Sequence, residues 1–313
     1  MKILLKITPY EPVYIEDWDQ VVRSSRTGTF LHLRSYMDYH SDRFDDCSIL
    51  VSNETGPIAV FPAHRVGDCV ASHDGLTFGG LITNATLRGH EVREIFCAII
   101  SHYKELGCSR MRYKPVPHIF HNYPAEDDLH QLFLLDSRII SRDISPVIDL
   151  SARLKISKSR KDGIRKARKR GLAVSEGGSL GDFHCLLSQV LSQHNVRPVH
   201  SIAELELLQQ RHPKWIRLVN IVEDGSLLAG AWLFMMNKVL HTQYLAASDE
   251  GRACGALDFL ISEIISEAEI NVDYISFGRS TENGGRFVNE GLEFQKEGFG
   301  ARNTTMDQYE VML

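Results

Sequence analysis

The stretch Asp249-Glu250-Gly251-Arg252-Ala253-Cys254-Gly255-Ala256 joins a strand pattern to a helix pattern and decides the fold. Residues 239–246 before it predict a strand, and the apolar residues after it recur on one helix face: Leu257, Leu260, Ile261, Ile264, Ile265 and Ala268. Residues 274–277 predict a further strand. Strand, glycine-containing turn, helix and strand make a βαβ unit, which indicates an α/β fold. The turn then lies at a helix N-terminus, where backbone N–H groups favour a phosphate.

The same alternation of strands and helices extends along the rest of the chain. Apolar periodicity predicts strands at 49–52, 58–63, 109–113, 216–222 and 227–236. It predicts a helix whose apolar residues recur on one face over 95–103 and which ends before Gly107. Further helices are predicted at 181–193 and 203–210. Because a domain holds roughly 150 residues, we expect two domains, 1–150 and 151–313.

The composition is that of a soluble globular protein, with 313 residues of which 43% are hydrophobic and 24% charged. The longest apolar run, 227–236, is shorter than the roughly 20 residues that cross a bilayer, and the N-terminus lacks a signal-peptide cleavage site. We therefore expect a cytoplasmic protein without a membrane span. The six cysteines form no C-x-x-C pair, so we expect neither a disulfide framework nor a metal site.

A basic segment lies within an acidic chain. Residues 153–170 hold ten Lys or Arg against the single acid Asp162, although the whole chain has a net charge of −5. Ser159-x-x-Asp162 predicts a capping box and Gly171 a stop, so we expect a helix over 160–170 whose apolar seam is Ile164 and Ala167 alone. The helix is either a solvated face or a site for phosphate or nucleic acid. Its lack of Trp and Phe argues against membrane insertion.

Two regions of the chain resemble known transferases. Arg252-x-x-Gly255-Ala256 resembles the Gln/Arg-x-x-Gly-x-Gly/Ala loop of acyl-CoA-dependent N-acyltransferases of the GNAT superfamily, although Leu257 occupies its last small position. Phe277-Gly278-x-Ser280 and Lys296-x-x-Phe299-Gly300 resemble the closing region of the Fem-type peptidyl (aminoacyl) transferases, with Gln295 where that family has Phe. Further similar motifs span nearly the whole chain: Thr29-Phe30-Leu31-His32, Phe78-Gly79-Gly80 and the basic helix.

The resemblance implies two tandem GNAT-like domains with mixed sheets flanked by helices. Residues 1–150 would form a degenerate domain on the acceptor side, and residues 151–313 the domain with the donor-binding turn, preceded by the basic helix 160–170. Other motifs are similar to a subgroup from bacterial surface-polysaccharide loci (O-antigen or capsule): Tyr113-Lys114-Pro115-x-Pro117-His118, Pro198-Val199-His200 and His241-Thr242-Gln243-Tyr244.

Three functions follow as hypotheses. The first is an N-acyltransferase that moves an acyl group from acyl-CoA, above all acetyl-CoA, to the amine of a nucleotide-linked amino sugar by direct attack. The second keeps the fold but takes aminoacyl-tRNA as donor and extends a peptidoglycan-like or secondary-metabolite precursor; the long coiled-coil insertion of the tRNA-using members is absent. The third is a nucleic-acid-binding module built on 160–170, against which the acidic remainder and the lack of stacking aromatics argue.

Acyl transfer to an amine needs a proton acceptor, a polarised carbonyl and a proton for the leaving group. His200, in a loop, and Glu290 are the candidate bases, with a structural histidine as the alternative for His200. On a regular strand His241 and Gln243 point to one face and Tyr244 to the other, so only a bulge lets them line one site. His241 and Tyr244 are further catalytic candidates, Tyr244 as proton donor.

The remaining candidates would hold the donor and the acceptor. Those expected at the donor are Arg252, Gly255, Ala256 and Ala246. Those expected at the acceptor are His73, Thr77 and Lys114 in the first domain, Lys161 and Arg165 on the basic helix, and Ser280, Glu282, Asn283 and Lys296 near the C-terminus. Cys254 would matter only if the reaction passed through an acyl-enzyme.

Overall fold

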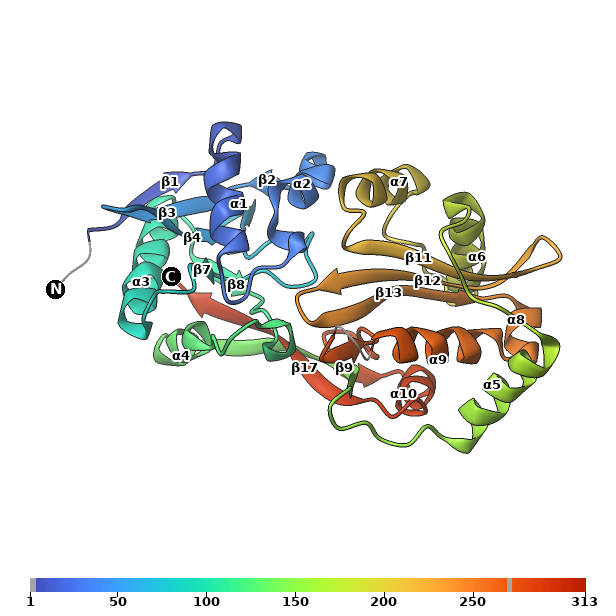
Figure 1. Ribbon diagram of the computed structural model, residues 1–313. Coiled ribbons are helices and arrows are strands. Elements are labelled where there is room, and N and C mark those ends of the chain that lie inside the picture. The colour runs from blue at the N-terminus through green and yellow to red at the C-terminus, as the bar shows by residue number, and fades with distance from the viewer. Residues whose placement is uncertain (1–3, 269–271) are drawn as a thin grey trace. The chain divides into compact units, whose positions relative to one another are not determined.

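The computed structural model describes residues 4–268 and 272–313, which form two compact units (Figure 1). Unit 1 comprises the residues up to Asp143 together with Asn283–Arg286 and Thr305–Leu313, and unit 2 comprises Ile144–Glu282 and Phe287–Thr304. Strands β9 (Arg138–Asp149) and β17 (Arg302–Met312) contribute residues to both units. The division at residue 150 stays a prediction; the contacts change unit at Asp143, and the end of the chain returns to unit 1.

Unit 1 contains an antiparallel sheet of order β1-β3-β4-β7. Its strands are β1 (Lys6–Pro9), β3 (Ile49–Asn53), β4 (Gly56–Phe61) and β7 (Ile82–Thr83). β3 and β4 pair as an antiparallel hairpin, so the strands predicted at 49–52 and 58–63 are confirmed. Further strands follow the order β17-β8-β6-β5-β2, with β2 (Asp45–Asp46), β5 (His64–Val66), β6 (Cys69–Ala71) and β8 (Arg110–Tyr113).

The helices of unit 1 pack on these strands and on one another. They are α1 (Ile15–Arg23), α2 (Arg34–Met37), α3 (Gly89–Glu105) and α4 (Asp127–Leu134), with 3-10 turns η1 (Pro12–Tyr14), η2 (Phe30–His32), η3 (Asp38–Arg43) and η4 (His118–Phe120). The stripe of α3 is buried at Ile95, Ile99 and Tyr103, and the helix ends before Gly107 as its sequence predicts.

Unit 2 contains a mixed sheet of order β10-β11-β12-β13-β14-β9. Its strands are β10 (Ser175–Glu176), β11 (Ile216–Glu223), β12 (Ser226–Met236), β13 (Val239–Ala247) and β14 (Tyr274–Ser276). β13 and β14 run parallel and are joined through α9 (Ala256–Ala268), so the predicted βαβ unit is confirmed. The α/β class, with mixed sheets flanked by helices, is confirmed as well.

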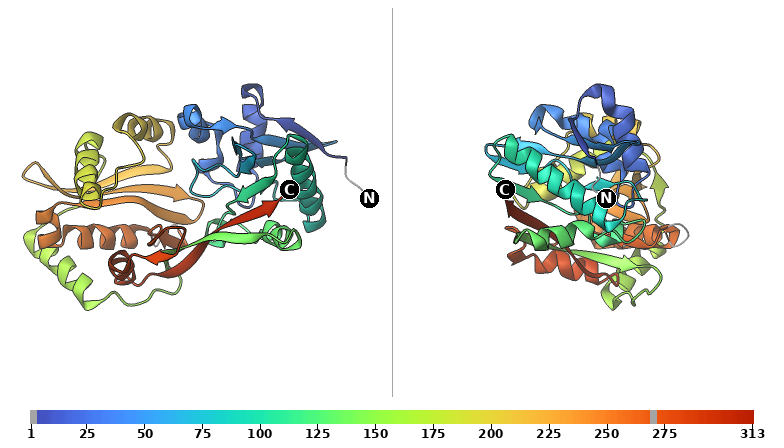
Figure 2. Two further views of the ribbon diagram at one scale, coloured as in Figure 1. Left: turned by 180° about the vertical axis from the view of Figure 1, so that it is seen from behind. Right: turned by 90° about the vertical axis from the view of Figure 1, so that its left-hand side faces the viewer.

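Helices cover both faces of this sheet. α6 (Leu180–Ser192) and α7 (Ile202–Arg211) lie on one face and α9 on the other, as two opposite views show (Figures 1 and 2). The remaining elements are α8 (Asp249–Cys254), α10 (Glu290–Glu297) and the hairpin of β15 (Thr281–Glu282) and β16 (Phe287–Val288). No helix within the described residues is long and apolar enough to span a membrane.

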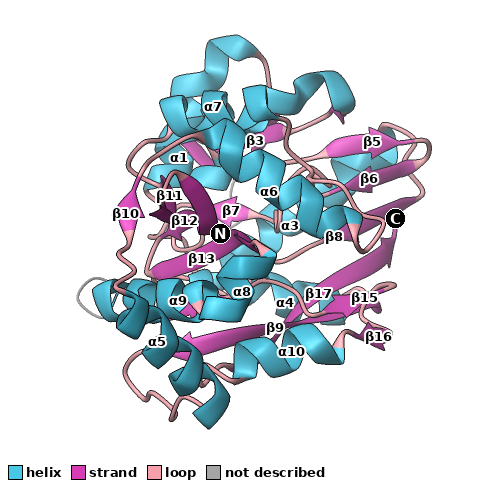
Figure 3. Cartoon of the chain, turned by 90° about the vertical axis from the view of Figure 1, so that its right-hand side faces the viewer, coloured by secondary structure: helices cyan, strands magenta, loops and turns pink. Residues whose placement is uncertain are grey.

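The basic helix is α5 (Lys158–Arg170), which packs beside α9 (Figure 3). As predicted, its buried residues are Ile164 and Ala167. Gly171 ends the helix in the left-handed backbone conformation, also as predicted. The predicted capping box is wrong. Ser157 caps the helix by accepting a hydrogen bond from the backbone N–H of Arg160 (3.4 Å), because Ser157 still has extended backbone while Ser159 lies in the first turn.

Candidate functional site

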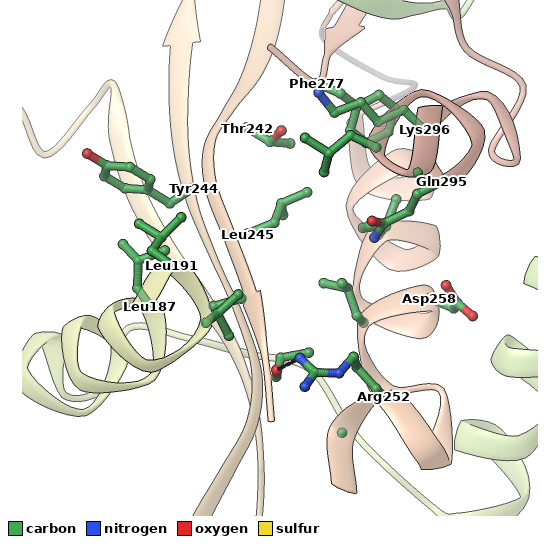
Figure 4. Close-up of a pocket in the computed structure, with 18 of the residues that line it drawn as sticks. Leu187, Leu191, Thr242, Tyr244, Leu245, Arg252, Asp258, Phe277, Gln295 and Lys296 are labelled. Carbon is green, nitrogen blue, oxygen red and sulfur yellow. Dashed lines mark hydrogen bonds between the residues drawn. The ribbon is translucent and has the colours of Figure 1, made fainter. Parts of the chain in front are cut away.

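A cavity of about 820 Å³ in unit 2 lies where β13 and β14 part. β13 pairs with β14 only from Val239 to His241, whereas it pairs with β12 as far as Ala247. Beyond His241 the outer edge of β13 has no strand partner within the described residues, so backbone N–H and C=O groups face the cavity. The cavity is lined by Thr242–Ala247 of β13, by parts of α6, α9 and α10, and by the α8–α9 turn (Figure 4).

β13 has a β-bulge beside this cavity. Trp232 of β12 pairs with Tyr244 and Leu233 pairs with Thr242, so Gln243 is the extra residue. Gln243 and Tyr244 both line the cavity, and so do Leu245–Ala247 after the bulge, because the cavity follows the open edge of β13 and not one face of the strand.

His241 lies before the bulge, is buried, and does not line the cavity. Its Nδ1 contacts Ser276 Oγ at 3.1 Å. Burial, together with the nearby positive charge of Lys296, lowers the pKa of His241 to about 4. The ring is therefore neutral at physiological pH, and its position indicates a structural contact between β13 and β14.

Tyr244 and His200 form a hydrogen-bonded pair. His200 is 4% exposed in the loop between α6 and α7, and its Nδ1 lies 2.8 Å from Tyr244 Oη. Burial raises the pKa of Tyr244, although the backbone N–H groups of His200 and Val199 oppose the rise. Of the pair, only Tyr244 lines the cavity, so His200 can act on a bound molecule through the tyrosine.

Lys296 of α10 places a buried ammonium in the cavity wall. It is 8% exposed, and its Nζ donates to Gly278 O (2.9 Å), Arg279 O (2.7 Å) and Ser280 Oγ (3.0 Å). Within the described residues no carboxylate lies at ion-pair distance, and burial lowers the pKa of Lys296 to about 8. Ser280 is buried outside the lining, so it positions Lys296 and has no access to a ligand in this cavity.

Thr242 is a cavity residue that was not among the sequence-based candidates. It is 5% exposed, and its Oγ1 has no hydrogen-bond partner within the part of the chain that the structure describes. A hydroxyl at a cavity wall that makes no bond to the protein can donate a hydrogen bond to a bound molecule. A β-branched residue in a strand carries no functional signal in the sequence, which is why it was missed.

Of the residues predicted to hold the donor, Arg252 and Gly255 of the turn and Ala246 of β13 line the cavity. Ala256 is buried outside the lining. Arg252 Nη1 donates to Ala247 O (2.7 Å), and its Nη2 pairs with Asp249. Cys254 is buried, with Sγ 3.5 Å from Gly251 O, and is not part of the lining.

α5 packs tightly against this turn. A Cβ on Gly255 would lie 2.2 Å from Gly163 O of α5, and the φ of Gly255 is +79°. Asp258, in the first turn of α9, accepts from Arg160 of α5 at 2.7 Å. Acids at a helix N-terminus compete with a bound phosphate for its positive end.

Several candidates lie away from this cavity. Glu290 is exposed at the start of α10, and Glu282 is exposed and accepts from Asn289 Nδ2 (3.2 Å). Asn283, with φ +51°, follows β15 and belongs to unit 1. Lys161 and Arg165 are exposed on α5, and Arg165 pairs with Asp162 at 2.9 Å. The structure therefore does not bring these five side chains to the cavity.

The unit 1 candidates lie in or beside the loop after β6. His73 is 3% exposed and stacks on His40; burial and its histidine neighbours lower the pKa of His73 to about 3. Lys114 Nζ donates to Leu76 O (3.0 Å) and lies 3.5 Å from Asp74, while Thr77 is exposed. A second cavity of about 800 Å³ in unit 1, lined by residues such as Arg26 and His121, contains none of them.

No described protein family and no curated protein sequence matches the chain. Among solved structures, FemX matches 98% of this chain and 97% of its own with a TM-score of 0.70 at 12% identity. This chain therefore has a FemX-like fold. The C-terminal domain of a putative lysylphosphatidylglycerol synthetase from Agrobacterium fabrum matches 95% of this chain and 91% of its own (TM-score 0.63, 15% identity). L-PGS from Bacillus licheniformis matches 96% and 91% (TM-score 0.62, 10% identity).

At these identities the likeness shows the fold alone, so chemistry must be argued from the cavity. Its walls combine a backbone edge, a buried ammonium, an unsatisfied hydroxyl and a tyrosine paired with histidine. Within the described residues no group of three or more His, Cys, Asp or Glu side chains is arranged to hold a metal ion.

Proposed function

We propose that the chain transfers an acyl group to an amine in the unit 2 cavity. The observation that carries this proposal is the position of Lys296, a buried cation to which no described carboxylate is paired, in the wall of a cavity that also holds Tyr244. A fixed positive charge in a dry site stabilises the oxyanion that forms when an amine attacks an acyl carbonyl. The Fem/GNAT-like fold supports the same reaction class.

In the proposed reaction the neutral amine attacks the acyl carbonyl directly. Lys296 stabilises the oxyanion electrostatically, because its three N–H groups already donate to protein oxygens. Tyr244 Oη accepts the amine proton while its own proton passes to His200 Nδ1, and the reverse transfer protonates the leaving group. Thr242 Oγ1 donates to the acyl group. Lys296, Tyr244 and Thr242 are catalytic residues in this scheme, and His200 acts through Tyr244.

Aminoacyl-tRNA is the donor that the charges favour. Asp249 and Asp258 lie beside the turn where a GNAT-type enzyme would hold a diphosphate, and Leu257 replaces its last small residue. By contrast, Lys158, Lys161, Lys166 and Lys169 form an exposed strip on the solvent side of α5, which suits a polynucleotide backbone. FemX is covered almost completely by this chain, so the lack of a long insertion does not count against Fem-type chemistry.

Acyl-CoA is the second candidate donor, and one observation favours it. The cavity runs along the unpaired β13 edge to Arg252 and Gly255, the two residues that match the GNAT motif. An extended pantetheine chain could hydrogen-bond to that edge.

As acceptor we propose the amine of a nucleotide-linked amino sugar for surface-polysaccharide assembly, on the strength of the motif resemblance.

The lysine strip distinguishes the two donors. We expect the triple variant Lys158→Glu, Lys161→Glu and Lys169→Glu to raise KM for aminoacyl-tRNA at least tenfold and to flatten its salt dependence. Transfer from a short 3′-aminoacyl-adenosine should be unchanged. The matched control is the triple variant Lys104→Glu, Lys214→Glu and Lys238→Glu, which makes the same charge change elsewhere on the surface. Activity with acyl-CoA that neither triple variant alters would instead establish the second donor.

A further inference from the structure

One wall of the unit 2 cavity is apolar. Leu187, Val190 and Leu191 of α6 line it at the i, i+3 and i+4 positions of one helix face. Leu187 and Leu191 lie beside Tyr244, on the other side of β13 from Leu245 (Figure 4). Because Tyr244 is the proposed proton acceptor, this wall borders the reacting atoms.

The charged residues of the cavity are mainly cationic. Asp258 is the one acidic residue among the described lining residues, and it is 2.7 Å from Arg160 Nη1. The other charged lining residues include Arg252 and Lys296. A positively charged acyl side chain would therefore find like charges and no uncommitted carboxylate among the described lining residues, which is unfavourable.

We infer that the acyl group transferred by this chain carries an uncharged, apolar side chain, which lies against Leu187, Val190 and Leu191. The inference rests on the proposed function and specifies its substrate class. It separates this chain from its neighbour named for a lysyl product, whose acyl group carries an ammonium. An apolar side chain of three or four carbons would displace water from the α6 wall and gain affinity in proportion to its buried area.

Binding of stable donor analogues tests this without an acceptor. The probes are 3′-amino-3′-deoxyadenosine amides of leucine, glycine and lysine, with isovaleryl-CoA and acetyl-CoA as the corresponding CoA pair. Calorimetry should give at least tenfold tighter binding for leucyl than for glycyl or lysyl, or for isovaleryl than for acetyl. Equal or tighter binding of the lysyl, glycyl or acetyl probe overturns the inference and leaves the proposed function standing. Failure of every probe to bind overturns both.

Variants of Leu191 test the place of the side chain. Leu191→Asp should weaken the leucyl probe at least tenfold and weaken the lysyl probe less or not at all. Val222→Asp is the matched control, because Val222 is 49% exposed on β11 and outside the cavity. If Leu191→Asp does not fold, Leu191→Ala should still reduce the leucyl preference over glycyl several-fold. Equal effects on all probes would contradict the placement against α6.

Discussion

The buried ammonium of Lys296 is the residue on which the proposed chemistry most depends. Its Nζ is held by Gly278, Arg279 and Ser280, so its position is fixed before any ligand binds. Burying a cation without a carboxylate is unfavourable, and proteins keep such groups mainly where function uses them. Lys296→Met should lower kcat/KM about a hundredfold or more, because the oxyanion loses its stabilising charge.

The pH dependence of Lys296 follows from the direction of its shift. A lysine is charged below its pKa, and burial lowers the pKa of Lys296 from 10.5 to about 8. Activity that needs the charge should therefore fall as pH rises through about 8. Initial rates from pH 6 to 10 measure this, and Lys214→Met, at an exposed lysine, serves as the control. A profile that is flat up to pH 10 would contradict the role of Lys296.

The Tyr244–His200 pair should behave as one unit. Tyr244→Phe removes the proton acceptor and His200→Gln removes the group behind it, so each should lower kcat about a hundredfold. The double variant should lose no more than Tyr244→Phe alone, because both act on one proton. Steady-state kinetics with circular dichroism as a folding check measures this. Full additivity would mean that His200 acts independently.

Thr242 should show opposite effects on stability and turnover. Thr242→Val keeps the side-chain shape and removes an unsatisfied buried hydroxyl, so the free energy of unfolding should rise by about 1 kcal/mol. At the same time kcat/KM should fall about tenfold, and Thr242→Ser should restore most of it. Urea unfolding and initial rates give both quantities. A variant that is less stable and fully active would assign Thr242 to packing alone.

At the scale of elements, α5 packs closely on the α8–α9 turn, and the contact is made by Gly163 of α5 and Gly255 of the turn. A Cβ on Gly255 would lie 2.2 Å from Gly163 O, and φ is +79°. Gly255→Ala should therefore destabilise unit 2 by about 3 kcal/mol, combining backbone strain with a backbone clash. Gly225→Ala is the matched control, because Gly225 has φ +76° with nothing within 4 Å and should cost only about 1 kcal/mol. If urea unfolding gives the same loss of free energy of unfolding for both variants, then α5 shifts to accommodate the added methyl group.

The helices and strands whose apolar residues recur regularly could be predicted from the sequence. α9 has an unbroken apolar stripe, and its glycine turn marked the βαβ unit. β9 was missed because Pro146 and the polar residues before it suggested a boundary. α10 was missed because it is only eight residues long and leaves Phe294 exposed. Its amphipathic period is too short to be recognised.

The site could be predicted in part for similar reasons. Lys296, Tyr244 and Arg252 were found through motif resemblance and residue chemistry, and all three line the cavity. The bulge at Gln243 could not be predicted, because it depends on the register between β12 and β13. Glu290 suggested a base by its type, but it lies on the outer side of α10. Spacing in sequence does not report which helix face meets a cavity.

At the scale of the whole molecule, the arginines and the lysines of α5 make different contacts. The arginines Arg160, Arg168 and Arg170 of α5 pair with acids elsewhere in unit 2, whereas its exposed lysines form no ion pair with another described residue. Arginine suits fixed, bidentate contacts and lysine suits a mobile polyanion. One helix thus attaches to the acidic body and presents a basic surface on a chain of net charge −5, as the proposed polyanionic donor requires.

The most direct test of the account is amide formation itself. Aminoacyl-tRNA or acyl-CoA is mixed with the full chain and a panel of UDP-, GDP- and dTDP-linked amino sugars, and the acceptor mass is followed over time. We expect that one amino sugar gains the mass of an apolar acyl group and that Lys296→Met slows this gain at least a hundredfold. No mass gain with any donor, or an unchanged rate in Lys296→Met, would contradict the assignment of the unit 2 cavity as the acyl-transfer site.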